Sequence, residues 1–427
     1  MRLMVITRRF PYPLDTGDQL TTFNLIKHFG QRHRVVLVTF VEPGQNLEDR
    51  AHLGDSVEAI YTVPLSRPLA YWRCARGVFS PRPLQICYYL APEMAALVAR
   101  VVDEFQPDLL YAHSIRMGEY LLAHGSRPTV LALQNSMTLH YGRLARVSRQ
   151  PFAKLLNTLE LRKMRSYEPW IAGQFDRCLL VSPVDAEAID GDLDNVFISP
   201  HGVDFEYFTP KPARNPEPGR IIFTGNMGFN ANVDAVSYFV SEILPLIRAQ
   251  LPHVKLAVVG ARPAPAVRRL ARDPAITVTG RVPDLRPWLD RAEVAIDPLR
   301  IGAGVQNKVL EGMAMALPMV ITSIANEGIG ARAHEHVLLA DDPDAFADAV
   351  IGLLRERERA NALGQRARRF IAEHWSWQKH FDDLEAELVR LVAARSTAAL
   401  GPTSVAAQAG YSRARPLDPI TARHWST

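Results

Sequence analysis

The stretch AIDPLRIGAGVQNKVLEGMAMALPMVI, Ala295–Ile321, decides how this chain folds. A short apolar run ends in a loop that contains Gly302 and Gly304, and an amphipathic segment follows from about Gln306. This order predicts a strand, a tight turn and a helix whose first amides are unpaired donors. Such a corner favours a bound anion, because free amides and the helix dipole both attract negative charge.

Two charged residues stand at the start of this predicted helix. Lys308 lies in the first turn, where the helix dipole disfavours a cation, so a bound anion would explain its placement. Glu311 lies one turn further on the same face, where its carboxylate could accept hydrogen bonds from ribose hydroxyls. We interpret Lys308 and Glu311 as residues that bind a nucleotide. The alternative is that they are ordinary solvated residues of a surface helix, which an isolated pair at this spacing more often is.

Apolar runs rich in β-branched residues alternate with helical patterns along the chain. From Pro92 to Phe105, apolar residues repeat at helical spacing, as expected of a helix that crosses over between parallel strands. The sequence therefore predicts an α/β protein with two Rossmann-like, doubly wound parallel sheets. We expect the strands at residues 3–7, 35–40, 57–63, 109–113, 130–134 and 179–182, and then from 221 onward and at 256–259, 276–279, 294–297, 319–322 and 337–339.

A proline-rich segment separates the two series of strands. TPKPARNPEPGR, residues 209–220, contains four prolines, which stiffen the chain and prevent regular structure. We therefore expect a first domain at 1–208, a linker at 209–220 and a second domain at 221–374. Residues 375–395 show the pattern of a final helix. Residues 396–427, rich in Ala, Ser, Pro and Thr, are expected to be a disordered tail.

Composition limits the class of protein. The 427 residues are 48% hydrophobic, enough to fill two cores, and the net charge of +4 is too small to indicate nucleic acid binding. The three cysteines have no metal-type spacing and cannot all pair, which favours the reducing cytoplasm. The chain start lacks a secretion signal, and no run approaches the roughly 20 apolar residues of a membrane span. Any membrane role is therefore expected to be peripheral, at the inner face.

Four stretches follow one another along the chain: VSPVDAEAI with ISPHGVDFEYFTP, IIFTGNMGFNANVDAVSYFVSEILP, KLAVVGARP with ITVTGRVPDLRPWLDRAEVAIDPL, and PLRIGAGVQNKVLEGMAMALPMVIT. They resemble, in the same order, the retaining glycosyltransferase family often called GT4. The resemblance covers most of residues 1–380 and is specific from Val196 onward. It implies the GT-B fold, in which two Rossmann-like domains face each other across a cleft. It also implies that the final helix, residues 375–395, packs back on the first domain. Within the family, the chain looks closest to sugar transferases of bacterial exopolysaccharide and exosortase systems.

The resemblance implies an activity and a donor site. The enzyme would transfer a sugar from a nucleoside diphosphate to an alcohol of a lipid-linked or polysaccharide acceptor. Base recognition would use main-chain contacts near Arg281 and Val282, and Glu327 would lie near the diphosphate. Lys308 and Glu311 would serve catalysis. The resemblance places the remaining donor contacts at Gly225, Asn226, Arg300, Gly302, Gly304 and Val305.

Two positions depart from the family pattern. Most relatives carry a cationic pair after the first strand of the second domain, where this chain has Asn226 and Met227. Lys308, together with Arg300, must then stabilise the leaving diphosphate, although Arg300 could equally be a surface cation. The first of two family glutamates is replaced by Ala303, which leaves donor orientation to the backbone. This favours, as an alternative, an inactive scaffold protein. A nucleotide-sugar epimerase, with the same fold but no acceptor, is a second alternative.

In the first domain, PYPLDTGDQL resembles the glycine loop of the family, which implies that Gly17 lies near the diphosphate and that Asp18 belongs to the donor site. Asp18 could also cap the helix that follows. His113 ends the predicted strand DLLYAH and matches a family histidine that lies near the sugar and stabilises developing charge. A purely structural histidine is an equal alternative. No enzymic carboxylate need act as a base, since in retaining GT-B enzymes the leaving phosphate is taken to accept the acceptor's proton.

Two further patterns concern metal and membrane. Asp192 and Asp194 form a D-x-D motif, but it lies remote from the donor segment, so we expect a structural role and no metal or other cofactor. Residues 143–165 contain seven basic residues and the acid Glu160 among apolar ones. Such a segment predicts peripheral contact with an anionic membrane, close to a lipid-linked acceptor. A solvated helix face is the alternative.

Overall fold

The computed structural model describes residues 1–14, 16–42, 47–147, 150–189, 191, 193–211, 214, 216–302 and 304–400. The chain forms two compact units, one of Met1–Ser199 with the chain from Phe381 onward, the other of Pro200–His380. Each unit holds one parallel sheet, so the predicted pair of doubly wound sheets is confirmed. In the predicted linker, 212, 213 and 215 lie outside the described residues, and those described before Arg220 have no regular structure.

The first unit is built on a seven-stranded sheet whose neighbouring strands are all parallel. The chain adds strands outward in one direction and then returns to the centre to add the others. The carboxyl ends of β1 and β4 therefore form the switch point at which open α/β sheets bind ligands. The spatial order is β3 (Ala59–Pro64), β2 (Arg34–Val41), β1 (Arg2–Thr7), β4 (Leu109–His113), β5 (Thr129–Gln134), β6 (Arg177–Leu180) and β7 (Val196–Ile198).

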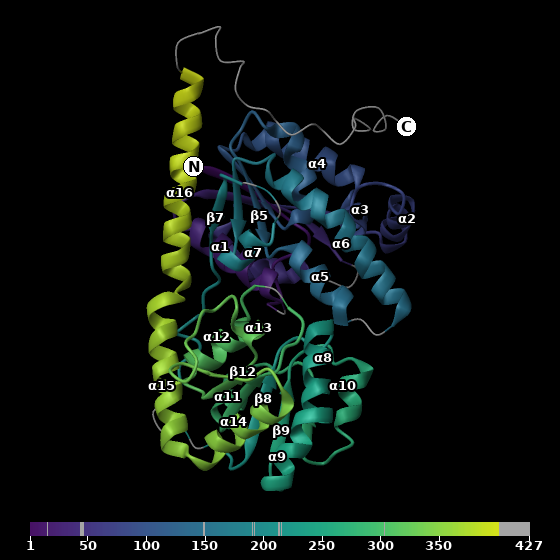
Figure 1. Ribbon diagram of the computed structural model, residues 1–427. Helices are drawn as coiled ribbons and strands as arrows, with labels where there is room; N and C mark the ends of the chain where they lie inside the picture. Colours follow the sequence, from purple (N-terminus) through teal and green to yellow (C-terminus); the bar gives the residue numbers. More distant parts are fainter. Residues whose placement is uncertain are drawn as a thin grey trace. The chain divides into compact units, whose positions relative to one another are not determined.

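Helices cover both faces of this sheet. Figure 1 shows α1 (Gly17–Phe29) and the yellow α16 (Trp377–Leu400) on one side, and α4 (Pro92–Phe105) and α6 (Pro151–Ala172) on the other. Alternate strand residues such as Met4 point toward α4 and α6 and form one buried core with them. The other helices are η1 (Leu47–His52), η2 (Gly54–Ser56), α2 (Arg67–Gly77), α3 (Leu84–Tyr89), η3 (Ile115–His124), α5 (Met137–Val147) and α7 (Pro183–Glu187).

The second unit is built on a six-stranded sheet with the same kind of topology. All its neighbouring strands are parallel, and the carboxyl ends of β8 and β11 form its switch point. The spatial order is β10 (Ile276–Val278), β9 (Lys255–Val259), β8 (Arg220–Thr224), β11 (Val294–Asp297), β12 (Met319–Ile321) and β13 (Leu338–Leu339).

In Figure 1, α8 (Asn230–Tyr238) and α10 (Pro265–Leu270) lie on one side of this sheet, and α12 (Asn307–Ala314) and α15 (Arg357–His374) on the other. α12 begins one residue after Gln306, as predicted. The remaining elements are the π-helical turn η4 (Phe239–Ile243), α9 (Leu244–Gln250), α11 (Arg286–Asp290), α13 (Ser323–Asn326) and α14 (Pro343–Arg355).

The final helix is longer than predicted. α16 continues to Leu400, so the prediction that the tail begins at Ser396 is wrong for its first five residues. Three of these are Ala or Leu, the strongest helix formers, and the helix propagates through them. The rest of the predicted tail, 401–427, lies outside the described residues.

Candidate functional site

The segment that decides the fold lies at the switch point of the second sheet. β11 ends at Asp297 and leads through a glycine-containing loop into α12, while the adjacent β8 leads through Gly225 into α8. Gly225 has φ +142°, and a Cβ there would lie 2.8 Å from Nδ2 of Asn232. The same Nδ2 donates to the carbonyl oxygen of Asn226 at 3.0 Å. Asn232 therefore fixes the loop after β8 to the start of α8.

Lys308 connects these two loops. Its ammonium lies 3.2 Å from Oδ2 of Asp297 and donates to Oδ1 of Asn232 and Oε1 of Gln306, both at 3.1 Å. Asp297 is fully buried, and burial raises its pKa although Lys308 opposes the shift. The protein itself thus supplies the negative charge that compensates Lys308. A bound anion is not needed to explain the placement of this lysine, and its catalytic role stays a prediction.

Sequence reasoning missed Asp297 and Asn232. A signal for Asp297 was present, because a carboxylate that ends an apolar strand needs a partner, and Lys308 is a cation in the helix that follows. Asn232 had no such signal, since it comes from a different strand–helix pair.

Glu311 lies one turn beyond Lys308 and is half-buried. Burial raises the pKa of its carboxyl group to about 7, because the nearby Lys308 only partly offsets the loss of solvent. Near neutral pH the group is therefore divided between its protonated and ionised forms. A ribose contact of the predicted kind would favour the carboxylate.

The glycine-containing loop packs closely against the residues that follow α13. Gly304 has φ +70°, and a Cβ on Gly328 would lie 2.7 Å from the carbonyl oxygen of Gly304 and 2.8 Å from the nitrogen of Val305. The chain around Glu327 is thereby brought beside the loop of Gly302, as the prediction of one shared site requires. Ala303 lies outside the described residues.

Arg300 already has partners within the second unit. Its guanidinium donates to both carboxylate oxygens of Asp234 at 3.0 and 2.6 Å and lies 4.3 Å from the centre of the Tyr238 ring. Binding a diphosphate would require it to leave or share this contact. Arg281 and Val282 follow β10, the edge strand two positions from β8, so within the second sheet they lie further from the switch point than the predicted donor residues that follow β8 and β11.

The first unit gathers charged residues at its own switch point. Asp18 lies inside α1, whose N-cap is Thr16 and whose first residue is Gly17. Its carboxylate accepts from Nε of Arg8 at 3.0 Å and from Oγ1 of Thr16 at 2.6 Å, and Nε of Arg9 lies 3.6 Å away. Burial alone would raise the pKa of Asp18, but Arg8 and Arg9 hold it well below its ordinary value. The expectation that Asp18 caps α1 is wrong, because its carboxylate binds Arg8 and lies next to Arg9 instead.

His113 ends β4 and is 2% exposed. Neither ring nitrogen has a hydrogen-bond partner among the described residues. Burial lowers the pKa of the imidazole to about 4, so the ring is neutral near pH 7. A neutral imidazole can donate or accept a hydrogen bond but carries no positive charge. Leaving such a group buried and unpartnered costs about 1–3 kcal/mol, which favours a binding role over a packing role.

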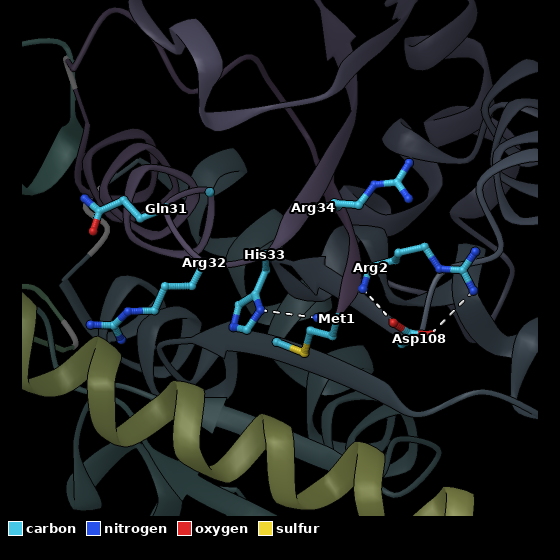
Figure 2. A pocket seen from close by; sticks show the side chains of 8 residues that line it. Met1, Arg2, Gln31, Arg32, His33, Arg34 and Asp108 are labelled. Atoms are coloured by element: carbon cyan, nitrogen blue, oxygen red, sulfur yellow. Dashed lines mark hydrogen bonds and ion pairs between the residues drawn. The ribbon is translucent and has the colours of Figure 1, made fainter.

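A shallow pocket of about 450 Å³ lies at the opposite, amino edge of the first sheet (Figure 2). Open α/β sheets bind ligands at the carboxyl edge, so its position does not favour a site. Its cationic side chains are moreover paired with acids. The pairs are Arg2 with Asp108 at 3.6 Å, Arg32 with Glu385 at 2.8 Å and Arg34 with Glu58 at 2.7 Å.

Within the described residues, His28, Asp382 and Glu385 form a group whose ligand atoms lie close enough to hold a metal ion. Arg32 already occupies this group, since its Nη1 lies 3.1 Å from Asp382 and 2.8 Å from Glu385. The arrangement is an ion-pair network between α1 and α16. Of the D-x-D motif, Asp192 lies outside the described residues.

The basic segment 143–165 spans parts of α5 and α6 and does not present all its charges to solvent. Lys163 is buried and donates to the carbonyl oxygens of Gly77 and Val78 at 2.7 and 2.9 Å. Glu160 is also buried. Large apolar side chains are instead exposed at the start of α6 and on α2 and the residues after it, namely Phe152, Leu155, Leu156, Leu69, Tyr71, Trp72, Val78 and Phe79. Over the described range, the chain has no helix able to span a bilayer.

Comparison with known proteins supports the resemblance seen in the sequence. Residues 218–356, which include the Lys308 site, match the family described as Glycosyl transferases group 1. An uncharacterised 44.6 kDa protein from the cps region of Klebsiella pneumoniae is 22% identical over 65% of this chain and 72% of its own length. A GDP-mannose-dependent α-(1-6)-phosphatidylinositol monomannoside mannosyltransferase of Mycobacterium tuberculosis is 29% identical over 44% of this chain and 53% of its own length.

Solved structures show the same fold. Sucrose-phosphate synthase from Thermosynechococcus elongatus aligns with a TM-score of 0.72 and 15% identity, covering 92% of this chain and 100% of that one. Anabaena Alr3699/HepE, crystallised with UDP, aligns with a TM-score of 0.64 and 13% identity, covering 91% and 100%. Both are consistent with the two doubly wound sheets, and the predicted GT-B fold is confirmed.

Proposed function

We propose that this chain, a GT-B glycosyltransferase whose residues 218–356 match group 1 of these enzymes, transfers a sugar from a nucleoside diphosphate to a lipid-linked or polysaccharide acceptor. The observation that carries the proposal is the junction of Lys308, Asn232 and Gly225 at the β8/β11 switch point. A cation, a glycine turn and a helix N-terminus meet there, which is the chemistry that holds a diphosphate. The cps-region and phosphatidylinositol mannoside relatives support an envelope glycan acceptor.

The residues suggest a division of roles. Asp297 and Asn232 hold the Lys308 ammonium at the end of β11, where it would neutralise charge on the departing diphosphate. Glu311 would accept hydrogen bonds from the ribose, and the neutral His113 would hydrogen-bond the sugar. We further propose retention at the anomeric carbon, with the leaving phosphate accepting the proton of the acceptor alcohol. No metal or other cofactor takes part in this scheme.

Titration of the purified protein with UDP, GDP and ADP, in the presence of EDTA, tests the donor site. We expect one of them to bind, and the corresponding nucleotide sugar is then titrated at about pH 6 and about pH 8. The pKa of Glu311 is raised to about 7, so its ionised fraction grows with pH across this range. If binding needs the carboxylate, affinity should rise about tenfold from the lower to the higher pH.

Glu311→Gln should abolish this pH dependence and weaken binding at the higher pH. Glu358→Gln, which alters an exposed carboxylate at the start of α15, is the matched control and should behave like the unaltered chain. A pH-independent affinity in the unaltered chain would contradict the role of Glu311. If none of the nucleotides binds, the hypothesis of an inactive scaffold protein is favoured over the proposed activity.

We also propose that the exposed apolar residues of α2 and its following turn contact an anionic membrane. Phe79 is 96% exposed and Trp72 56%, and the Arg76 guanidinium lies 4.7 Å from the centre of the Trp72 ring. Aromatic side chains next to arginine are typical of residues at a bilayer interface. This surface would bring the enzyme to a lipid-linked acceptor.

Trp72→Ser and Phe79→Ser should each lower the fraction of protein that sediments with phosphatidylglycerol vesicles, by about tenfold in partition coefficient. Leu246→Ser alters an exposed leucine of the second unit and serves as the control. Equal sedimentation of all three variants and the unaltered chain would show that α2 is not the contact.

A further inference from the structure

We propose that Arg8, Arg9 and Arg116 in the first unit form a binding site for a phosphoryl group. The inference rests on the proposed function in one respect, because the phosphoryl group would belong either to the acceptor or to the donor. Both sources present the same chemistry, charged phosphate oxygens that a planar guanidinium can bind in pairs.

The topology brings these arginines to one edge of the sheet. β1 and β4 are neighbours, and Thr7 lies opposite His113, so Arg8 and Ser114 leave the sheet side by side. Ser114 has φ +97°, a backbone conformation that a residue with a side chain adopts only at a cost. Its Oγ accepts from the backbone nitrogen of Arg116 at 3.4 Å and from Nη1 of Arg116 at 3.3 Å. The strained turn thus holds Arg116 at the switch point.

The cluster has more positive than negative charge. Asp18 is the carboxylate that Arg8 and Arg9 share, and it cannot offset three guanidinium groups. In the described part of the chain, Arg116 has no ion pair with a carboxylate, and Nε of Arg9 has no hydrogen-bond partner. Burial, followed by the like charge of Arg8, lowers the pKa of Arg116 to about 10. A cation in such surroundings is stabilised by a bound anion.

Unpartnered polar groups surround the same spot. His113, buried and neutral, ends β4 directly before Ser114, and neither of its ring nitrogens has a partner among the described residues. On the neighbouring strand β5, Oε1 of Gln134 also lacks a hydrogen-bond partner among the described residues. The amino-edge pocket of Figure 2 differs, since its arginines are paired with acids there. Missing partners and excess positive charge coincide at the β1/β4 edge, which is where the fold places ligands.

In the second unit, two predicted donor-site cations are paired with carboxylates. Lys308 is compensated by Asp297, and Arg300 by Asp234. Lys308 and Arg300, which would neutralise a diphosphate, are therefore each already paired with a carboxylate. The switch point of the first sheet therefore has more positive charge that no carboxylate compensates than the switch point of the second sheet. Its arginines would bind either the donor diphosphate or a phosphate carried by the acceptor.

Inorganic pyrophosphate is a suitable probe, titrated by calorimetry into the full chain. We expect it to bind, and Arg116→Gln to weaken binding by about 10- to 100-fold, the effect of losing a charge-assisted contact. Arg9→Gln should weaken it similarly and serves as a second variant should Arg116→Gln not fold. Arg127→Gln removes the same charge at the amino edge, where Arg127 donates to the carbonyl oxygen of Pro107, and should have no effect.

The nucleotide titration then separates the two sources. If Arg116→Gln also weakens the nucleoside diphosphate that binds the unaltered chain, the phosphoryl group is that of the donor. If nucleotide affinity is unchanged while pyrophosphate affinity falls, the group is that of the acceptor. Either outcome supports the site. Pyrophosphate that fails to bind, or binds Arg116→Gln and Arg9→Gln as tightly as the unaltered chain, overturns it, even when nucleotide binding at the Glu311 site is intact.

Discussion

Lys308→Met will lower the free energy of unfolding by about 3–5 kcal/mol, because it leaves a buried carboxylate without its ion-pair partner. Asp297 is fully buried, and its contact with Lys308 spans 3.2 Å. The substitution also removes the hydrogen bonds that Lys308 donates to Asn232 and Gln306. Denaturant unfolding followed by circular dichroism at about pH 8 measures the effect.

The loss should depend on pH in a defined direction. The folded-state pKa of Asp297 is raised, so stability tied to its protonation is present below the unfolded pKa and falls as pH rises. Removing Lys308 raises that folded-state pKa further. The deficit of Lys308→Met relative to the unaltered chain should therefore be smaller at about pH 5 than at about pH 8.

A double variant separates structure from binding. Asp297→Asn combined with Lys308→Met removes both charges, and most of the lost stability should return. Nucleotide affinity should not return, because the cation is still absent. A double variant as unstable as Lys308→Met would show that the ion pair is not what Lys308 contributes to folding. Recovery of nucleotide affinity would show that the lysine does not contact the donor.

His113→Leu will reduce turnover by about 100-fold or more while leaving stability equal or higher. The imidazole is buried without a hydrogen-bond partner among the described residues, so an apolar side chain of similar size removes an unpaired polar group. A hydrogen bond to the sugar, made as charge develops, would be lost. Release of nucleoside diphosphate from the nucleotide sugar measures turnover, and thermal unfolding measures stability.

His124→Leu is the matched control, since His124 ends a helix of the first unit away from the strand edge. It should leave turnover unchanged. His113→Asn retains a hydrogen-bond donor and should recover part of the rate. A fall in the stability of His113→Leu by several kcal/mol, with turnover lowered only in proportion to the folded fraction, would assign this histidine to packing.

Local patterns in the sequence predicted much of the fold. The helix from Pro92 to Phe105 has its predicted limits, and α12 begins beside Gln306, since apolar periodicity and glycine act over a few residues. The strand β7 was not predicted. Gly225, Gly304 and Lys308 follow the neighbouring strands β8 and β11, and their binding roles stay predictions.

Tertiary structure decided which charges compensate one another. Asn232 reaches Lys308 only because β8 and β11 are neighbours, although many residues separate them in the chain. Arg300 meets Asp234 for the same reason. Alternating apolar runs identify strands and helices, but the order of strands depends on how all of them pack at once. The excess charge around Arg116 follows from that order, so no local pattern could reveal it. The pairing of Lys308 with Asp297 is different, because both residues belong to one strand–loop–helix segment.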